Sequence, residues 1–503
     1  MARHRRLAPL ALAVTMAAPT LLAHGQPVER LPPWSVTAAR TSRPAAETAQ
    51  ATREFGADTL ANGLALDQAL RADPAFSLFR RTDSLSAHPT AQGVSLRGIG
   101  PSGASRSLVL LDGVPLNDPF GGWVIWNQMP VAGLATVEVA RGGGSALWGS
   151  SALSGTIALV SAPVARAGGA FEFTAGARAT TLAQLSAGAT AAGVALRIDA
   201  RAFATDGYPP LAAAERGAID VPLSSDHRAL QLRAQRVLGE IETTVTLRRY
   251  GEDRVNGTAG QTNSTALTFG SVALRGRTRS DGDWRLVAYG QDQTFRGTFT
   301  SASLDRATET PANRQFDVPA TAAGAALTLD WQADAARTTI GADVRHVRGE
   351  TREEFLFANG AFTRRRFAGG TQTLGGAFLA HDRALAAGWR GAIALRADRW
   401  QLADGTRREI NLLTGAPTRL DIFPRRTGTT GSANLGLTWT PRDAARVRFA
   451  AYRAFRVPTL NELYRPFRVG NIATEANAAL RPETLHGAEI GADYRAGSAE
   501  FSV

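Results

Sequence analysis

Regular alternation of apolar and polar side chains, which runs through most of the chain, constrains the fold more than any other feature. In the segment ALQLRAQ, Leu230 and Leu232 fall on one face, whereas Gln231 and Arg233 fall on the other. A period of two residues is typical of a β-strand whose two faces meet different surroundings. Segments of roughly ten residues with this pattern recur toward the C-terminus. We therefore expect a mainly β fold with antiparallel strands over residues 164–503.

The lengths of the connections favour a transmembrane β-barrel over a soluble sandwich. Outer-membrane barrels alternate short periplasmic turns with long outer loops. The short connections that we predict are residues 191–193, 239–240, 334–335, 386–388 and 441–444. The long ones are residues 206–226, 301–321, 352–370 and 403–430.

The polar faces of these segments carry arginine, among them Arg233, Arg248 and Arg396. Such a face cannot be a dry core, because each charge would need a partner. A wet barrel lumen accepts it. A β-helix or an adhesin stays open as an alternative, although the chain has no fixed short repeat.

The N-terminus has the composition of a secretory signal peptide over residues 1–25. Arg3, Arg5 and Arg6 precede an apolar run, and small residues at 23–25 supply a cleavage site. The alternative is an N-terminal membrane anchor. Residues 26–53 are rich in Pro, Ala, Thr and Arg and predict a flexible arm.

Net charge and cysteine content limit the partners and the chemistry. The formal net charge is +12, and cysteine is absent, which excludes disulfides and thiolate metal sites. In a secreted chain this basic excess favours an anionic membrane surface over a nucleic acid.

Residues 54–163 differ from the rest and predict a small mixed α/β domain. Leu66, Ala69 and Leu70 fall at helical spacing before Asp73-Pro74 ends the run. The segments GVSLRG, SLVLLDG, ATVEVARG and GTIALVSA then read as short strands that end near glycine or small residues.

No catalytic, metal or cofactor site emerges from the motifs. Residues 98–103 match G-x-G-x-x-G, but a dinucleotide site needs a helix next, and another strand-like segment follows. A glycine hairpin between two strands explains them better. The seven histidines lack metal-ligand spacing, and no carboxylate pair or nucleophile motif is present.

Several linked motifs make the chain resemble the TonB-dependent outer-membrane receptors. In the N-terminal domain these are LDQALRADPAFSLFR, GVSLRGIG, LVLLDGVPLND and LATVEVARGGGSALWGSSALSGTIALVS; in the barrel they are FRVPTLNELY and LRPETLHGAEIGADY. Gly143, Trp148 and Ala158 depart from the Pro, Tyr and Asn usual in the family.

The resemblance implies an N-terminal plug inside a 22-stranded barrel in the outer membrane of a Gram-negative bacterium. Such a protein binds a scarce ligand, such as a ferric siderophore, a corrinoid, haem or an oligosaccharide, and imports it to the periplasm. The energy would come through the partner TonB, with no catalysis and no cofactor in this chain. A passive porin or an adhesin-type barrel is the alternative.

In the arm, Val36, Thr37 and Ala38 resemble the core of the TonB box, the segment that TonB binds. An extended peptide of this kind adds its backbone to the edge of a partner's sheet, so that a loose sequence match suffices. A featureless linker is the alternative.

The loop after LVLL has two interpretations. LVLL predicts a buried strand, and Asp112-Gly113 its turn. In the resembled family the next segment, PLNDPFGGWVIWNQ, faces the ligand, which implies contacts from Asn117, Asp118, Phe120, Trp123 and Trp126. The rings could instead only wedge the plug against the barrel wall, an alternative about as strong for Trp126.

Arginine runs occupy the long connections, at residues 364–366, 407–408 and 425–426. We expect them to form a solvated rim that touches anionic lipopolysaccharide, in preference to a substrate site.

Counting from Gly168 predicts fourteen full strands, the last near residues 483–495, and a fifteenth that begins at Ser498. Single-chain bacterial barrels close with an even number of strands, and an open edge of unpaired backbone groups cannot face lipid. We therefore expect a fragment that lacks about seven strands, or roughly 150 residues, with a gap between its first and last strands.

Overall fold

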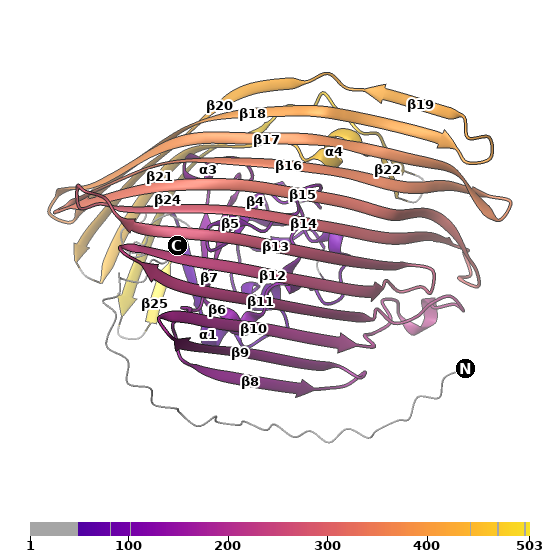
Figure 1. Cartoon of the computed structure of the whole chain (residues 1–503), viewed down its shortest axis with the longest axis horizontal. Helices are drawn as coiled ribbons and strands as arrows, with labels where there is room; N and C mark the ends of the chain where they lie inside the picture. Colours follow the sequence, from indigo (N-terminus) through magenta and orange to yellow (C-terminus); the bar gives the residue numbers. More distant parts are fainter. Residues whose placement is uncertain (1–48, 81, 101, 443, 470–471, 497–498) are drawn as a thin grey trace.

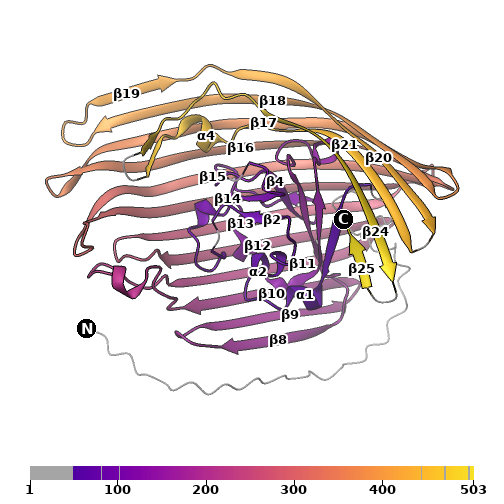
Figure 2. The same cartoon turned by 180° about the vertical axis from the view of Figure 1, so that it is seen from behind.

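The computed structural model describes residues 49–80, 82–100, 102–442, 444–469, 472–496 and 499–503. Its largest part is a curved sheet of long antiparallel strands around a small N-terminal domain (Figure 1). The same domain is seen from behind in Figure 2, on the inner side of the sheet. The signal peptide and the Val36–Ala38 segment lie outside the described residues.

The curved sheet contains sixteen strands. They are β8 (Gly168–Ala175), β9 (Thr181–Ala191), β10 (Val194–Thr205), β11 (Ser225–Leu238), β12 (Ile241–Val255), β13 (Thr262–Arg277), β14 (Asp283–Ala302), β15 (Glu309–Ala333), β16 (Ala336–Ala358), β17 (Ala361–Ala386), β18 (Trp389–Asn411), β19 (Pro417–Ile422), β20 (Arg426–Arg442), β21 (Ala445–Arg456), β24 (Glu483–Ala496) and β25 (Ala499–Ser502). Its connections hold η5 (Ala213–Glu215), α4 (Leu460–Tyr464), β22 (Phe467–Val469) and β23 (Ile472–Thr474).

The strand order confirms the expected antiparallel architecture. Neighbours in the sheet follow the chain from β8 to β25, with β19 paired beside β18. Fourteen strands of this path precede the short β25, which agrees with the predicted count. Among the described residues no pairing joins β8 to β25, so the sheet is open between them. That the sequence is a fragment stays a prediction.

The two faces of the sheet differ as the alternation predicts. Leu230 and Leu232 of β11 are 37% and 41% exposed on the outer face, whereas Gln231 and Arg233 are buried on the inner face. The apolar side chains therefore point outward, as they do in a barrel that faces lipid.

The short connections are confirmed, but most of the predicted long ones are not irregular loops. β16 and β17 continue almost to a two-residue turn at Asn359-Gly360, where both φ angles are positive (53° and 79°). Ion pairs such as Arg365–Glu354, at 2.6 Å, link the two strands near this end. Charged side chains occupy both faces there, as the consecutive Arg352, Glu353 and Glu354 show, so the alternation disappears from the sequence while the backbone pairing continues. Residues 206–224 are the exception and are largely irregular.

The N-terminal domain is the mixed α/β unit expected. Its elements are β1 (Thr52–Gly56), α1 (Ala57–Leu60), α2 (Leu66–Leu70), β2 (Phe76–Leu78), η2 (Pro89–Ala91), β3 (Val94–Leu96), β4 (Ser107–Leu111), β5 (Val114–Pro115), η3 (Trp126–Gln128), η4 (Val131–Gly133), β6 (Leu134–Arg141), α3 (Ser145–Trp148) and β7 (Gly155–Ser161). The main sheet has the order β1-β6-β7-β4-β5, in which only the β4–β7 pair is parallel. Because β1 begins at Thr52, the last two residues of the predicted arm belong to this sheet.

Two segments of this domain carry the turn and glycine motifs of the sequence. Asp112 and Gly113 have φ of 48° and 83°, so they form the predicted two-residue turn, between β4 and β5. The glycine motif at residues 98–103 precedes no helix, but it does not form a hairpin either. β3 pairs with β2 in a separate sheet, so the motif links two sheets. In the described part of the chain, no helix is both long and apolar enough to cross a membrane.

Candidate ligand site and plug–barrel interface

The loop of residues 117–126 is shaped by its own two polar side chains. Asn117 Oδ1 accepts from the backbone N–H of Val109, at 2.9 Å, and Asn117 Nδ2 donates to the carbonyl oxygen of Ser107, at 3.2 Å. Asp118 Oδ1 accepts from the N–H groups of Phe120 and Gly121, at 2.8 and 2.7 Å. The two residues predicted to orient a ligand therefore hold the loop in its present conformation.

Asp118 also ties the loop to the barrel wall. Its Oδ2 accepts a hydrogen bond from Gln293 of β14. Burial raises the pKa of the Asp118 carboxyl, and the hydrogen bonds from Gly121, Gln293 and Phe120 oppose that rise. Arg345 of β16 donates to the carbonyl oxygen of Asn117, at 3.2 Å. Two barrel strands thus contact the same loop.

The three rings of the loop are all buried and separate into two groups. Trp126 belongs to the core of the N-terminal domain, where it meets Phe76 edge to face, with centroids 5.6 Å apart. Phe120 and Trp123 join a second cluster that includes barrel residues such as Tyr250 and Trp400. Phe120 lies against Gly349 of β16, since a Cβ added there would come within 2.7 Å of its ring. This arrangement fits the wedge alternative, and ligand contact stays a prediction.

An element that sequence reasoning missed covers this loop. Residues 457–482, here called the α4 connection, join β21 to β24 and contain α4. The Asn461 N–H donates to the carbonyl oxygen of Phe120, at 3.0 Å, and Leu460 and Leu463 are fully buried. The signal in the sequence is the capping box Thr459-x-x-Glu462, in which each side chain bonds the other residue's backbone N–H.

Partly buried ion pairs surround the α4 connection where it meets both domains. Arg456 of β21 pairs with Glu462, at 2.8 Å, and with Glu483 of β24, at 2.7 Å. Arg106 of the N-terminal domain also pairs with Glu483, at 2.7 Å. Burial raises the pKa of Glu462, but the Arg456 hydrogen bonds and charge outweigh it, so that the net shift is downward. The group therefore stays ionised and links α4 to the barrel, and Arg106 of the N-terminal domain lies 4.0 Å from it.

The arginine runs do not form a single solvated rim. Arg366 lies inside, where it pairs with Glu353 at 2.7 Å and Glu409 at 2.8 Å. Arg407 is also buried and pairs with Glu409, at 2.8 Å. By contrast, Arg365 is partly exposed. The alternation of the extended strands explains the division, because successive arginines point to opposite faces.

The arginines expected in a wet lumen contact the N-terminal domain. Arg233 donates to the carbonyl oxygen of Ala162, at 2.7 Å, and pairs with Asp199, at 3.0 Å. Arg248 points at the sulfur of Met129, at 3.1 Å. Arg396 pairs with Asp343 of β16, at 2.8 Å, and donates to the carbonyl oxygen of Leu147 in the N-terminal domain, at 3.5 Å. The inner face is polar as expected, but at these positions the plug, rather than open water, meets it.

His88 is a buried residue of the N-terminal domain to which the sequence assigned no role. Its ring lies between Phe295 and Phe299 of β14, at centroid distances of 5.7 and 5.4 Å. Burial and the charge of Arg254 lower its pKa to about 3, which keeps the imidazole neutral at physiological pH. In the described part of the chain, no group of three or more His, Asp or Glu residues is placed to hold a metal ion.

Comparisons with protein families and known proteins agree with this geometry. Residues 44–156 match the family model of the TonB-dependent receptor plug domain. Residues 216–503 match the model described as TonB dependent receptor-like, beta-barrel.

The individual proteins that are similar to this chain have low sequence identity to it. A stretch of 158 residues is 28% identical to the vitamin B12 transporter BtuB of Vibrio vulnificus (strain CMCP6) and covers 30% of this chain, but only 24% of that transporter's length. The copper transporter OprC has a TM-score of 0.71 at 16% identity, over 89% of this chain and 70% of its own. The ferric yersiniabactin receptor FyuA of Yersinia pestis has a TM-score of 0.67 at 14% identity, over 90% and 71%.

Proposed function

The chain belongs to the TonB-dependent receptor family, and from that premise we propose that it binds a small-molecule ligand at the cell surface and imports it across the outer membrane to the periplasm. The observation that carries the proposal is the separately folded domain held inside the curved sheet by Arg106, Asp118 and Arg233. A domain in that place blocks free diffusion, so passage needs a conformational change and a source of energy.

The energy comes from TonB, which binds the arm at Val36, Thr37 and Ala38. Strand addition suits this contact, because backbone hydrogen bonds tolerate a variable sequence. The chain itself performs no covalent chemistry and is not an enzyme.

The ligand belongs to the ferric siderophore or corrinoid class. The names of similar proteins include a vitamin B12 transporter and a ferric yersiniabactin receptor. Asn117, Asp118, Phe120, Trp123 and Trp126 contact the ligand, and the α4 connection must move first, because it covers Phe120. The exposed arginines at the long-connection end contact lipopolysaccharide.

A passive porin or an adhesin is the alternative function. Neither would need a plug that fills the interior, and a porin with this many plug contacts would conduct little. The position of the N-terminal domain therefore favours active import.

The test is uptake by cells that lack the gene and carry it back on a plasmid. We expect growth on one iron or cobalamin source to depend on the gene. Val36→Pro should abolish uptake and leave surface binding intact, because proline removes a strand donor. Ala46→Pro, in the same arm but outside the proposed box, is the control. Wild-type uptake by the Val36→Pro variant would place the box elsewhere, and growth that no source makes gene-dependent would contradict import of these ligands.

A further inference from the structure

The outward face of the sheet has an apolar band that begins at a pair of tryptophans. Trp389 of β18 and Trp439 of β20 lie opposite each other next to short turns, with their rings stacked at 5.5 Å. Beyond them on β18, Ile393 and Leu395 are 45% and 49% exposed on the same face. Aromatic residues at the edge of an exposed apolar band mark the membrane–water interface of a barrel.

A groove of about 590 Å³ interrupts this band across β17, β18, β20 and β21. Small residues on the outward face make its centre, where Ala397 lies opposite Ala377 on one side and Gly431 on the other. Leu379 and Leu395 border it toward the tryptophans. The lining residues are Ala377, Phe378, Leu379, Leu395, Arg396, Ala397, Gly431, Ser432, Ala433 and Arg453.

A cation lies at the edge of the groove. On β21, Tyr452 and Ala454 point inward, since both lie against Gly143 of the plug, so Arg453 between them points outward. Its Nη1 donates to the carbonyl oxygen of Gly431. Arg453 lies opposite Ala433 on one side and His486 on the other.

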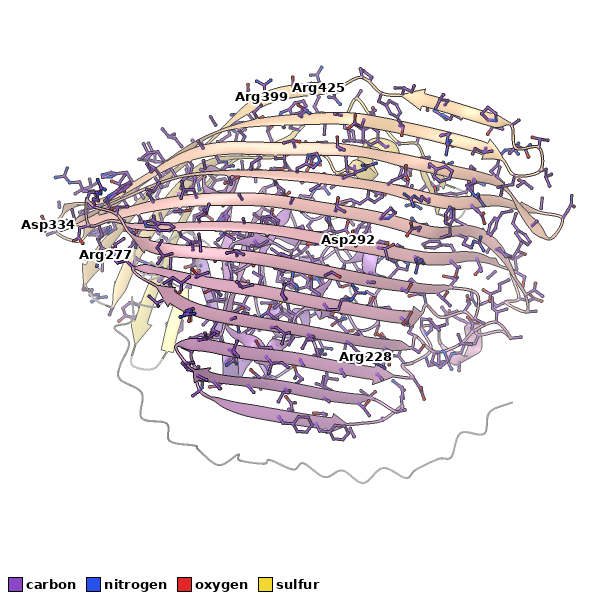
Figure 3. The ribbon with its side chains drawn as sticks, viewed as in Figure 1. Arg228, Arg277, Asp292, Asp334, Arg399 and Arg425 are labelled. Carbon is purple, nitrogen blue, oxygen red and sulfur yellow. The ribbon has the colours of Figure 1, made fainter. Side chains whose placement is uncertain are left out.

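Arg453 lacks a negative partner in this apolar setting. Within the described residues its guanidinium donates to a neutral carbonyl oxygen and makes no ion pair with an acid. An arginine on the lipid face of a barrel is unfavourable, and most so near the bilayer midplane. An anionic group beside the guanidinium would offset that cost. A second cation, Arg399, stands two residues beyond Ala397 on the same face and points away from the sheet (Figure 3).

The depth of the groove indicates which leaflet it faces. From Trp389 to Ala397 the strand rises about 26 Å at roughly 3.3 Å per residue. With a strand tilt near 40°, that is roughly 20 Å of an apolar band about 25 Å tall. The groove thus lies in the half remote from the tryptophans and the short turns, which is the outer leaflet if those turns are periplasmic.

We propose that this groove binds a phosphorylated glycolipid of the outer leaflet, with one acyl chain over Ala377, Ala397 and Gly431 and a phosphate on Arg453. The small residues leave room for a chain, and the unpaired cation at the edge fits the phosphate. The inference rests on the proposed outer-membrane location and not on import or on the imported ligand.

The experiment is native mass spectrometry of the full chain, purified in a mild detergent and titrated with diphosphorylated lipid A. Arg453→Gln removes the charge and keeps an amide donor for the Gly431 carbonyl. Ala397→Phe fills the groove from the lipid side without touching the core. Arg228→Gln, an exposed outward arginine on β11 remote from the groove (Figure 3), is the matched control. Each variant must keep the wild-type circular dichroism.

We expect Arg453→Gln and Ala397→Phe each to weaken lipid A binding at least tenfold, and Arg228→Gln to change it less than twofold. Dephosphorylated lipid A should bind wild type as weakly as the phosphorylated form binds Arg453→Gln. Equal binding by wild type and either groove variant would overturn the proposal. So would equal binding of phosphatidylglycerol, which would assign the groove to a glycerophospholipid, or a dimer peak that lipid A does not displace. Because the assay measures no uptake, its failure leaves the proposed import untouched, and a failure of import leaves the groove untouched.

Discussion

Single side chains of the loop at residues 117–126 hold the loop in its observed conformation. Asn117 accepts from the N–H of Val109 in β4, and Asp118 accepts from the N–H of Phe120 in the loop; buried donors of this kind are costly when unpaired. Phe120 fills the space that Gly349 leaves on β16. These contacts do not prevent the same residues from meeting a ligand, but they require that the loop rearrange first.

The first prediction concerns the rings of this loop. The double substitution Phe120→Ala with Trp123→Ala should weaken ligand binding by about 2–3 kcal/mol, as truncation of buried aromatic anchors usually does. Titration of the purified protein with the ligand identified by growth measures the effect. Ile125→Ala, a buried aliphatic change in the same loop, is the control for packing loss. A folded double mutant with wild-type affinity, or an equal loss in the control, would assign the rings to packing alone.

At the scale of elements, the sequence indicated strands and turns well, because burial on one face leaves a readable pattern. β4 and β7 appear as largely apolar runs, and the Asp112-Gly113 turn appears as a residue pair that tolerates positive φ. The ends of β15 to β17 were not predicted as strands, because charged side chains on both faces remove the alternation. α4 was not predicted, because a helix of five residues has too few turns to give a periodic pattern.

The contacts of the candidate site were less predictable than its residues. The five loop residues could be named from the resemblance, but their partners come from strands more than 170 residues away, such as Gln293 for Asp118. No local pattern reports such a pairing. The same holds for Arg106 and Glu483, which are 377 residues apart in the chain.

The second prediction tests whether the α4 connection depends on its ion pairs. Glu462→Gln keeps a side chain accepted at the third position of a capping box but removes the charge beside Arg456. Because Glu483 still pairs with Arg456, we expect a local loss of about 2 kcal/mol, below the roughly 3–5 kcal/mol of a buried charge left alone. Hydrogen exchange at residues 460–464 should become roughly thirtyfold faster.

The control for this change is Glu475→Gln in the same connection. Glu475 pairs with Arg407 at 2.8 Å, but its side chain is 68% exposed, so its loss should change exchange little. Unchanged protection of α4 in Glu462→Gln would show that apolar packing of Leu460 and Leu463 holds the helix by itself.

At the scale of the whole molecule, hydrogen bonds and an ion pair connect the plug to several strands of the barrel. Arg106 reaches Glu483 of β24, Arg233 of β11 reaches Ala162, and Arg254 of β12 donates to the carbonyl oxygen of Ala87 at 3.1 Å. Expulsion of the plug as one body would break all of these contacts together. Movement of one part, such as the loop beneath the α4 connection, breaks fewer of them.

The last prediction cross-links the loop at residues 117–126 to β16 by a disulfide. The chain has no cysteine of its own, so two introduced cysteines can pair only with each other. A Cβ added at Gly349 would lie 3.0 Å from the Cβ of Phe120, so Phe120→Cys with Gly349→Cys could form a disulfide after the loop and β16 separate by about half an ångström. The control pair is Gly169→Cys with Ala187→Cys, at 3.2 Å between two neighbouring barrel strands. If the loop must leave the wall during import, the oxidised Phe120–Gly349 variant should lose uptake at least tenfold and recover it on reduction, whereas the control should transport in both states. Equal uptake before and after reduction, with the disulfide verified by mass, would mean that the ligand passes while the loop stays on β16.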